Sequence, residues 1–419
     1  MDPATQYLLN RVQNIEDNVK FSPIYVVPDI LTEDNSSPFT PRVVSIGPLH
    51  EGRTNLKLVE SKKPAYLKEL LLKVGSLEET LDKCVKKVRG SIQEIKRCYF
   101  GVKTYTEDEI RLEMFTPEDE LVQMMVMDGC FILQFIIKLP IDGNLFSDNR
   151  LRSRNIALDL VLLENQIPFF VLQDIYDLTV KKLKETPSLT TMLKGLLDHI
   201  NPFEEPLIDK HVGKDTTHYH ILGLLHKFYD PNIELPRIKE IPTAHSVVEL
   251  DNVGVKIRPN ENLTWPMAME FHKPTLKMPV VRIDNFFEVV LRNLIAYEQY
   301  SPVKNYVTSY AMAMRMLAAT PEDIAKMGKA GVIVSHLGSN ENASDMISRI
   351  CKNVNLQDFY YIEPWKNVDK YYDSYWPRKL GVFKRTYIDP PWKAIAVLGA
   401  VIVFLITVVT FFRQPTSLI

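Results

Sequence analysis

The chain has 419 residues, of which 46% are hydrophobic and 24% are charged, and its formal net charge at pH 7 is −2. An intrinsically disordered protein has fewer apolar residues or a larger charge excess, so the composition excludes that class. The nearly neutral charge provides no general attraction to nucleic acid, and no nucleic-acid partner is expected.

Residues 1–54 are predicted to form an extended N-terminal arm. The stretches "FSPIYVVPDI" (21–30) and "SPFTPRVVSIGPLH" (37–50) are interrupted repeatedly by proline, which favours extended backbone over helix. The residues before them lack a basic segment followed by an apolar core, so no secretory signal peptide is predicted.

Residues 55–390 are predicted to form a mainly helical body. Helical periodicity runs from residue 55 to about 93 and breaks near Gly75. Residues 118–139 are apolar nearly all round, which indicates a central core helix capped by Thr116 with Pro117 in its first turn. Asp128 in the middle argues against a second membrane span there. Residues 150–180 predict two helices interrupted at Pro168.

The second half of the body is predicted to alternate irregular, strand and helical segments. Residues 186–245 are expected to form an irregular excursion over the helical body. Residues 267–280 alternate on both sides of His272–Thr275, which predicts a β-hairpin. Further helices are expected at the end of the body, with Asp284, Thr320 and Ser344 as their caps. The fold class is therefore mainly α with a small β-hairpin.

Residues 394–412 contain no charged side chain. As a helix they would be about 28 Å long, which matches the hydrocarbon core of a bilayer. The sequence therefore predicts one transmembrane helix, with Trp392, Lys393 and Arg413 at the membrane interfaces and residues 413–419 as a short tail.

Basic residues are concentrated on the N-terminal side of this span. Arg413 stands alone on the other side. This asymmetry predicts a single-pass, tail-anchored protein whose body is cytosolic. Three glycosylation sequons argue mildly for the opposite orientation: Asn35, Asn262 and Asn342. The basic residues on the N-terminal side are Arg378, Lys379, Lys384, Arg385 and Lys393.

No catalytic residue, cofactor or metal site is predicted. Cys130 lies in an apolar stretch, which favours a buried, inert thiol. Glu164-Asn165-Gln166 precede Pro168 and are interpreted as side chains that satisfy backbone groups where the helix breaks, although a polar binding pocket is the alternative. His218 and His220 could share a strand face and bind a metal, a minor alternative to an amphipathic helix start.

Two further features leave alternatives open. The four cysteines (Cys84, Cys98, Cys130 and Cys351) favour reduced thiols, although a Cys84–Cys98 bridge remains an alternative. The aromatic residues within 359–376 indicate either a partner-binding or interfacial surface or a buried support beneath the anchor.

Several motifs resemble the plant domain-of-unknown-function 247 family and occur in family order. The first arm segment departs from the family pattern, because Ser22 stands where a cysteine is common. The resemblance implies a single-span plant membrane protein without established catalytic residues, and some grass members are similar to pollen-side determinants of self-incompatibility. The motifs are "VVSIGPLHEG" (43–52), "MDGCFI" (127–132), "LLENQIPFFVL" (162–172), "RNLIAYEQ" (292–299) and "YYDSYWPRKL" (371–380).

Three functional hypotheses follow. The first is a membrane-anchored recognition or signalling module that works through an unknown protein partner. The second is a membrane-tethered enzyme whose site is assembled from residues distant in sequence, and it requires a pocket where carboxylates, histidines or Cys130 converge. The third is a structural adaptor without a sensing role.

Overall fold

The computed structural model describes residues 2, 5, 6, 22–32, 38–99, 117–139, 150–207, 218–232, 242–261, 265–374 and 391–413. Within these ranges the fold is mainly helical, as the sequence predicts. The helices are α2 (Lys57–Glu60), α3 (Lys63–Val74), α4 (Leu77–Gly90), α5 (Ile92–Tyr99), α7 (Glu118–Ile137), α8 (Arg150–Asp159), α9 (Phe169–Leu178), α10 (Leu189–Asp198), α11 (Ile221–Phe228), α12 (Val247–Asn252), α13 (Asn285–Tyr300), α14 (Tyr306–Leu317), α15 (Pro321–Lys329), α16 (Asn340–Ile350), α17 (Ile362–Tyr372) and α19 (Pro391–Arg413).

The N-terminal arm segment, defined here as residues 22–32 and 38–50, contains no strand and no α-helix. Its regular structure is limited to two short 3₁₀ turns, η1 (Asp29–Leu31) and η2 (Pro48–His50). Its apolar side chains, including Ile24, Val44 and Ile46, are nevertheless buried in the main core. The arm is therefore part of the body, although most of its backbone groups must find partners outside regular structure.

The predicted break near Gly75 is confirmed. Gly75 separates α3 from α4 and has a φ of 136°, a region that side chains rarely allow. Ser76 then caps α4, because its hydroxyl accepts the backbone N–H of Glu79. Acidic residues in the first turn and basic residues in the last turn of α4 complement the helix dipole.

Helix α7 is the central core helix that its composition predicts. It packs against α3, α4 and α9, and most of its residues are buried on all sides. Gly129 allows the closest approach, since a Cβ atom there would lie 2.4 Å from Cδ1 of Ile175 on α9. The N-cap position is Pro117 and makes no side-chain cap bond, whereas the predicted cap, Thr116, lies outside the described residues.

The predicted hairpin is present, but it belongs to a larger sheet. Strands β2 (Glu270–His272) and β3 (Thr275–Met278) pair antiparallel, and β1 (Lys256–Pro259) adds to β3 in parallel. A second, two-stranded parallel sheet joins β4 (Val281–Ile283) to β5 (Ile333–Ser335). The parallel pairs were not predicted, because such short strands leave no periodic signal in the sequence.

Two predictions for the second half need correction. Residues 186–245 contain the helices α10 and α11, so the excursion is less irregular than expected. Ser344 does not cap a helix, because α16 begins at Asn340 and Ser339 provides the cap. The other two caps are confirmed: Asp284 accepts the N–H groups of Phe286 and Phe287, and Thr320 forms a reciprocal capping box with Asp323.

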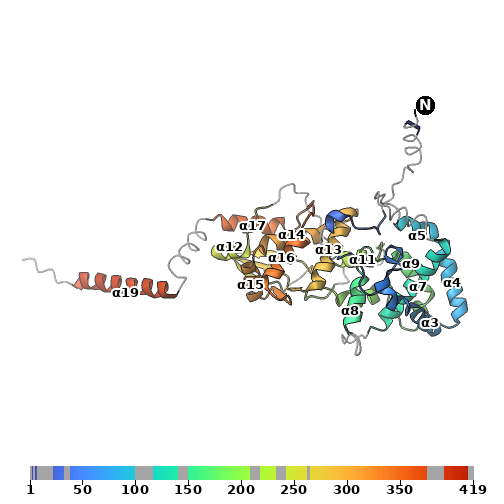
Figure 1. Cartoon of the computed structure of the whole chain (residues 1–419). Coiled ribbons are helices and arrows are strands. Elements are labelled where there is room, and N and C mark those ends of the chain that lie inside the picture. The colour runs from blue at the N-terminus through green and yellow to red at the C-terminus, as the bar shows by residue number, and fades with distance from the viewer. Residues whose placement is uncertain are drawn as a thin grey trace, which may run out of the picture.

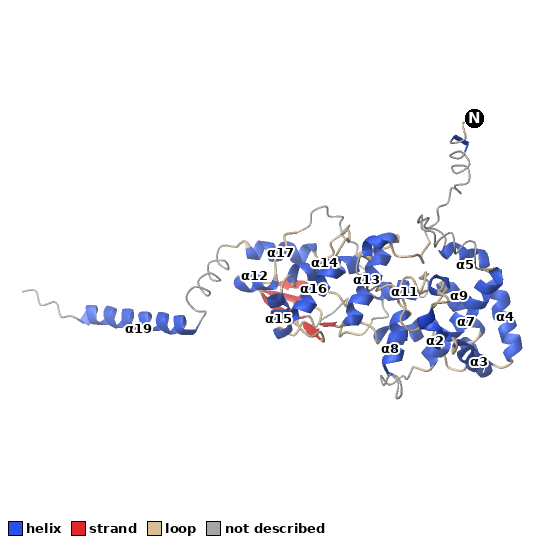
Figure 2. Cartoon of the chain, viewed as in Figure 1, coloured by secondary structure: helices blue, strands red, loops and turns tan. Residues whose placement is uncertain are grey.

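The body is elongated (Figure 1). Helices α3, α4, α5, α7, α8 and α9 gather at one end, and α12 and α14 to α17 gather at the other, with α11 and α13 between them. The strands lie at the α12–α15–α16 end (Figure 2). A single buried hydrophobic cluster extends from the arm to α17, so the two ends share one core.

Candidate functional site: a polar clasp on the N-terminal arm

Four of the five segments that carry the sequence motifs meet around the arm segment: 43–52, 127–132, 162–172 and 292–299. The side chains of Asp128, Asp159, Glu164, Asn165 and Asn293 are buried and bind its backbone. These five residues are called the arm clasp below. They come from α7, α8, the loop after α8 and α13.

Asp159 binds three consecutive N–H groups of the arm. Its Oδ1 accepts the N–H of Arg42 at 3.0 Å, and its Oδ2 accepts those of Val43 at 2.7 Å and Val44 at 3.0 Å. Burial raises the pKa of the Asp159 carboxyl to about 6, while the three N–H donors act in the opposite direction. The carboxylate thus replaces the neighbouring strand that an extended segment normally needs.

Glu164 and Asn165 hold the arm on either side of this point. Oε1 of Glu164 accepts the N–H of Val27 at 2.8 Å, and Oε2 lies 2.9 Å from Nε2 of His50. Oδ1 of Asn165 accepts the N–H of Ile46 at 2.7 Å, and its Nδ2 donates to the carbonyl of Val44. Two adjacent side chains therefore fix arm residues that are far apart in the sequence.

Gln166 has the role that the sequence predicts for all three polar residues before Pro168. Its Nε2 donates to the carbonyls of Leu160 and Leu162, both at 2.8 Å. Its Oε1 accepts the N–H of Ile221 at the start of α11. The prediction was therefore right about backbone satisfaction, but Glu164 and Asn165 mainly satisfy the arm rather than the broken helix.

An ion cluster closes the clasp at Gly47. Nζ of Lys63 lies 2.6 Å from Oδ1 of Asp128 and 2.7 Å from Oε2 of Glu60, and it donates to the carbonyl of Ser45 at 2.6 Å. Oδ2 of Asp128 accepts the N–H of Gly47. Burial acts to lower the pKa of Lys63, but the charges of Asp128 and Glu60 outweigh it and raise that pKa.

Gly47 is required by both conformation and space. Its φ is 72° and its ψ is −176°, a combination essentially restricted to glycine. A Cβ atom there would lie 2.4 Å from the backbone oxygen of Gln166. The motif "VVSIGPLHEG" therefore requires its glycine, because the backbone at this position lies against the loop before Pro168.

The other candidate residues do not converge with this cluster on an open site. Cys130 is fully buried on α7, and burial raises the pKa of its thiol. His226, Glu298 and Tyr306 form a separate buried network, with Nε2 of His226 2.9 Å from Oε1 of Glu298. Glu298 also accepts the N–H groups of Val307 and Thr308 at the start of α14, which is a capping role.

His218 and His220, the candidate metal ligands, have different surroundings. His220 caps α11: its Nδ1 accepts the N–H of Gly223, and its Nε2 lies 3.1 Å from the carbonyl oxygen of Pro23. The ring of His218 packs edge-on against Phe169. Burial lowers the pKa of His218 to about 4 and of His220 to about 3. Within the described ranges no three His, Cys, Asp or Glu residues are grouped as a metal site.

The described part of the aromatic segment 359–376 is largely interior. Phe359, Tyr361 and Trp365 are buried, and the Tyr361 ring stacks on Trp265 with centroids 5.6 Å apart. The hydroxyl of Tyr361 donates to the carbonyl of Met267. Of the two alternatives, a buried support is therefore the one that this part of the segment fits. All four cysteines are free thiols.

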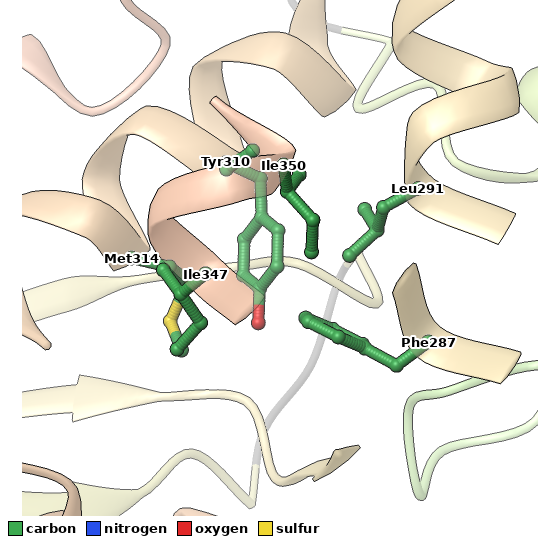
Figure 3. A pocket seen from close by; sticks show the side chains of 7 residues that line it. Phe287, Leu291, Tyr310, Met314, Ile347 and Ile350 are labelled. Atoms are coloured by element: carbon green, nitrogen blue, oxygen red, sulfur yellow. The ribbon is translucent and has the colours of Figure 1, made fainter. Parts of the chain in front are cut away.

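A small apolar cavity lies between α13, α14 and α16 (Figure 3). It has room for about one water molecule, so it is far too small for a substrate. The hydroxyl of Tyr310 is buried there without a hydrogen-bond partner in the described part of the chain. The other lining residues are Phe287, Leu291, Ala311, Met314, Ile347 and Ile350.

We expect Tyr310→Phe to stabilise the protein by about 1 kcal/mol, because an unpaired buried hydroxyl costs about 1–3 kcal/mol. Tyr306→Phe is the matched control: the Tyr306 hydroxyl donates to the carbonyl of His226, and its removal should cost about 1–2 kcal/mol. Urea unfolding followed by tryptophan fluorescence measures both. Equal destabilisation by the two changes would show that Tyr310 has a partner in solution.

Two helices are apolar enough to raise the question of a membrane. Helix α7 is long and apolar enough to span one, but 72% of its most apolar window is buried inside the body, and Asp128 in its middle is paired with Lys63. The described residues of α19 include a shorter apolar stretch, Leu398–Thr410. The backbone of α19 includes the predicted interface residues Trp392, Lys393 and Arg413, whose side chains lie outside the described ones.

The described side chains of α19 present apolar surface on every side of the helix. Nine large apolar residues between Ile395 and Val409 are 49% to 72% exposed, and six of them are consecutive, from Val401 to Ile406. The hydroxyls of Thr407 and Thr410 donate to the carbonyls of Val403 and Ile406, one turn earlier. The two polar side chains in this stretch are therefore satisfied within the helix.

Comparison with known proteins gives a family relationship over most of the chain. The family model DUF247, plant protein of unknown function, matches residues 24–406. UPF0481 protein At3g47200 of Arabidopsis thaliana is 27% identical over 92% of this chain and 84% of its own. Putative UPF0481 protein At3g02645 of the same plant is 21% identical over 94% and 90%. No solved structure matches the chain.

Proposed function

The chain belongs to DUF247, a family of plant proteins of unknown function, and we propose that it is a recognition or signalling module held at a membrane by α19. The observation that carries the proposal is the uniformly apolar exterior of α19. Nine large apolar side chains exposed to water would be costly, whereas in lipid they favour insertion by several kcal/mol. A helix also satisfies its own backbone there.

The recognition part of the proposal rests on the positions of the polar motif residues and of the exposed apolar side chains. The polar motif residues bind the arm inside the body, so their hydrogen-bonding groups are used to hold the fold. Large apolar side chains remain exposed on the body instead, including Ile30 on the arm at 55% and Tyr300 at the end of α13 at 40%. Exposed apolar groups on a folded body are typical of protein contacts when they cluster.

The anchor is tested by fractionating membranes from cells that express the full chain. We expect the full-length protein to resist alkaline carbonate extraction, and a variant lacking residues 394–412 to be soluble and folded. Ile406→Lys places one charge at the helix centre, which costs about 3 kcal/mol of insertion, and should weaken retention. Ser417→Lys in the tail is the matched control and should leave retention unchanged.

Two outcomes contradict the anchor. Full-length protein that dissolves without detergent would remove the need for a membrane. Aggregation of the variant lacking 394–412 would mean that this segment belongs to the core of the body rather than to lipid.

A cytosolic body is the orientation that the basic flank favours. We expect protease added to the cytosolic side of sealed vesicles to digest the body. The sequon at Asn342 offers an internal check, since this residue lies exposed in the first turn of α16; Asn35 and Asn262 lie outside the described residues. Glycans on Asn342 would place the body on the opposite side of the membrane.

A further inference from the structure

The C-terminal end of α17, the last described helix before α19, is held by residues from elsewhere in the body. Nε2 of His245 lies 3.1 Å from Oδ1 of Asp369. The His245 ring stacks on Tyr372, with centroids 4.0 Å apart and planes inclined by 24°. These three residues, His245, Asp369 and Tyr372, are called the α17 clamp.

The neighbouring residue, Tyr371, is held from a different direction. Its ring lies 5.9 Å from that of Phe271 on β2, and Nζ of Lys273 lies 5.3 Å from its centroid. The last turn of α17 is therefore fixed by two separate segments, the one before α12 and the β2–β3 hairpin.

The contact between His245 and Asp369 is close but poorly aligned for a hydrogen bond. Oδ1 of Asp369 is buried, and no donor among the described residues meets it in hydrogen-bond geometry, although Nε2 of His245 is 3.1 Å away. A buried carboxylate oxygen without a donor is unfavourable. A positive charge on the imidazole supplies attraction that does not depend on good hydrogen-bond alignment.

We propose that the α17 clamp is a pH-sensitive joint that holds the end of α17 more tightly when His245 is protonated. Protonation converts the contact with Asp369 into an ion pair and the stack on Tyr372 into a cation–π contact. Histidine is the side chain whose charge ordinarily changes between pH 5 and 8, so the joint responds to mild acidification.

The charges around the clamp set its working range. Burial raises the pKa of the Asp369 carboxyl, and Asp373 at the C-cap of α17 adds to this effect, whereas His245 and a backbone hydrogen bond from Thr243 oppose it. Lys273 faces the adjacent Tyr371 rather than the pair. Strong acid protonates Asp369 and removes the ion pair, so the joint is tightest at mildly acidic pH.

This joint lies where the body leads into the proposed anchor. If α19 is inserted in a membrane, the pull of the tether reaches the body at the end of α17. The consequence for a tethered protein rests on the proposed function, but the joint itself is a property of the body and is tested without a membrane.

Hydrogen exchange of the full chain in detergent provides the test. We compare protection factors of α17 backbone amides at pH 5.5 and 7.5, which removes the chemical dependence of exchange on pH. We expect the last turn of α17 to be about tenfold better protected at pH 5.5, as for one gained charge-assisted hydrogen bond. His245→Phe keeps the stack and should abolish the difference. Asp369→Asn keeps the shape and should reduce the difference to the contribution of the cation–π contact with Tyr372.

His272→Gln is the control, since His272 is an exposed histidine 3.2 Å from Glu270 and its loss should leave the response intact. Equal protection at the two pH values in the unaltered protein overturns the proposal. So does a pH response that persists in His245→Phe or keeps its full size in Asp369→Asn, and Asp369→Asn decides alone if His245→Phe unfolds α17. None of these results depends on membrane insertion.

Discussion

Lys63→Met is expected to destabilise the protein by about 3–5 kcal/mol, which is a large part of the stability of a typical domain. Lys63 is buried and neutralises Asp128, which is also buried, and it donates to the carbonyl of Ser45. Removing the ammonium leaves the Asp128 carboxylate without its counter-charge in the core. Urea unfolding in mild detergent, followed by tryptophan fluorescence, measures the change.

The double variant Lys63→Met with Asp128→Leu separates the charge from the packing. Replacing both partners of a buried pair by apolar groups is often close to neutral, so the double variant should recover much of the loss. Recovery should be incomplete, because Asp128 also accepts the N–H of Gly47.

A surface pair provides the matched control for this cycle. Nζ of Lys138 lies 2.5 Å from Oε2 of Glu69, but the two side chains are 41% and 47% exposed. Lys138→Met should therefore cost less than about 1 kcal/mol. If Lys63→Met costs no more than Lys138→Met, the buried cluster is not a counter-charge for Asp128 and the clasp must be stabilised differently.

The helical half of the fold was predictable because its signals are local. The break at Gly75, the interruption at Pro168 and the caps Asp284 and Thr320 each depend on a residue and its immediate neighbours. Ser344 is a good cap residue by type, but it lies inside α16, and Ser339 caps the helix by accepting the N–H of Asn342. Local preference alone cannot choose between two nearby caps.

The arm clasp could be predicted only in part. The polar run Glu164-Asn165-Gln166 between apolar residues predicts buried polar groups that need hydrogen-bond partners. The hydrogen-bond partners of this run could not be predicted, because those of Glu164 and Asn165 lie more than a hundred positions away. Lys63 shares the helical period of Leu56, Val59 and Tyr66, which predicts its face, but its counter-charge Asp128 lies 65 positions away and leaves no local signal.

The second large effect is expected at Asp159. Asp159→Ala removes the acceptor of three consecutive buried or half-buried N–H groups, at Arg42, Val43 and Val44. At about 1–3 kcal/mol for each donor left unpaired, we expect a loss of about 3–5 kcal/mol and faster hydrogen exchange in residues 42–44. Gln173→Ala is a suitable control, because among the described residues its side-chain amide donates only to Asp177 on its own helix.

The pH dependence at this site has a definite sign. The folded pKa of Asp159 is about 6, above the reference value of 3.8, so the folded protein binds this proton more tightly than the unfolded chain. The contribution of Asp159 to stability is therefore full below about pH 4 and is lost as the pH rises through 6, a difference of about 3 kcal/mol.

Asp159→Asn tests that sign directly, because an amide does not titrate. At pH 7 the change removes the cost of a buried charge, but it also turns one N–H acceptor into a donor that faces the N–H of Arg42. We therefore expect a smaller loss than for alanine, and a weaker dependence of unfolding free energy on pH between 4 and 6. A pH profile identical to that of the unaltered protein would show that Asp159 does not titrate there, and that the arm binds a carboxylate that stays charged throughout this range.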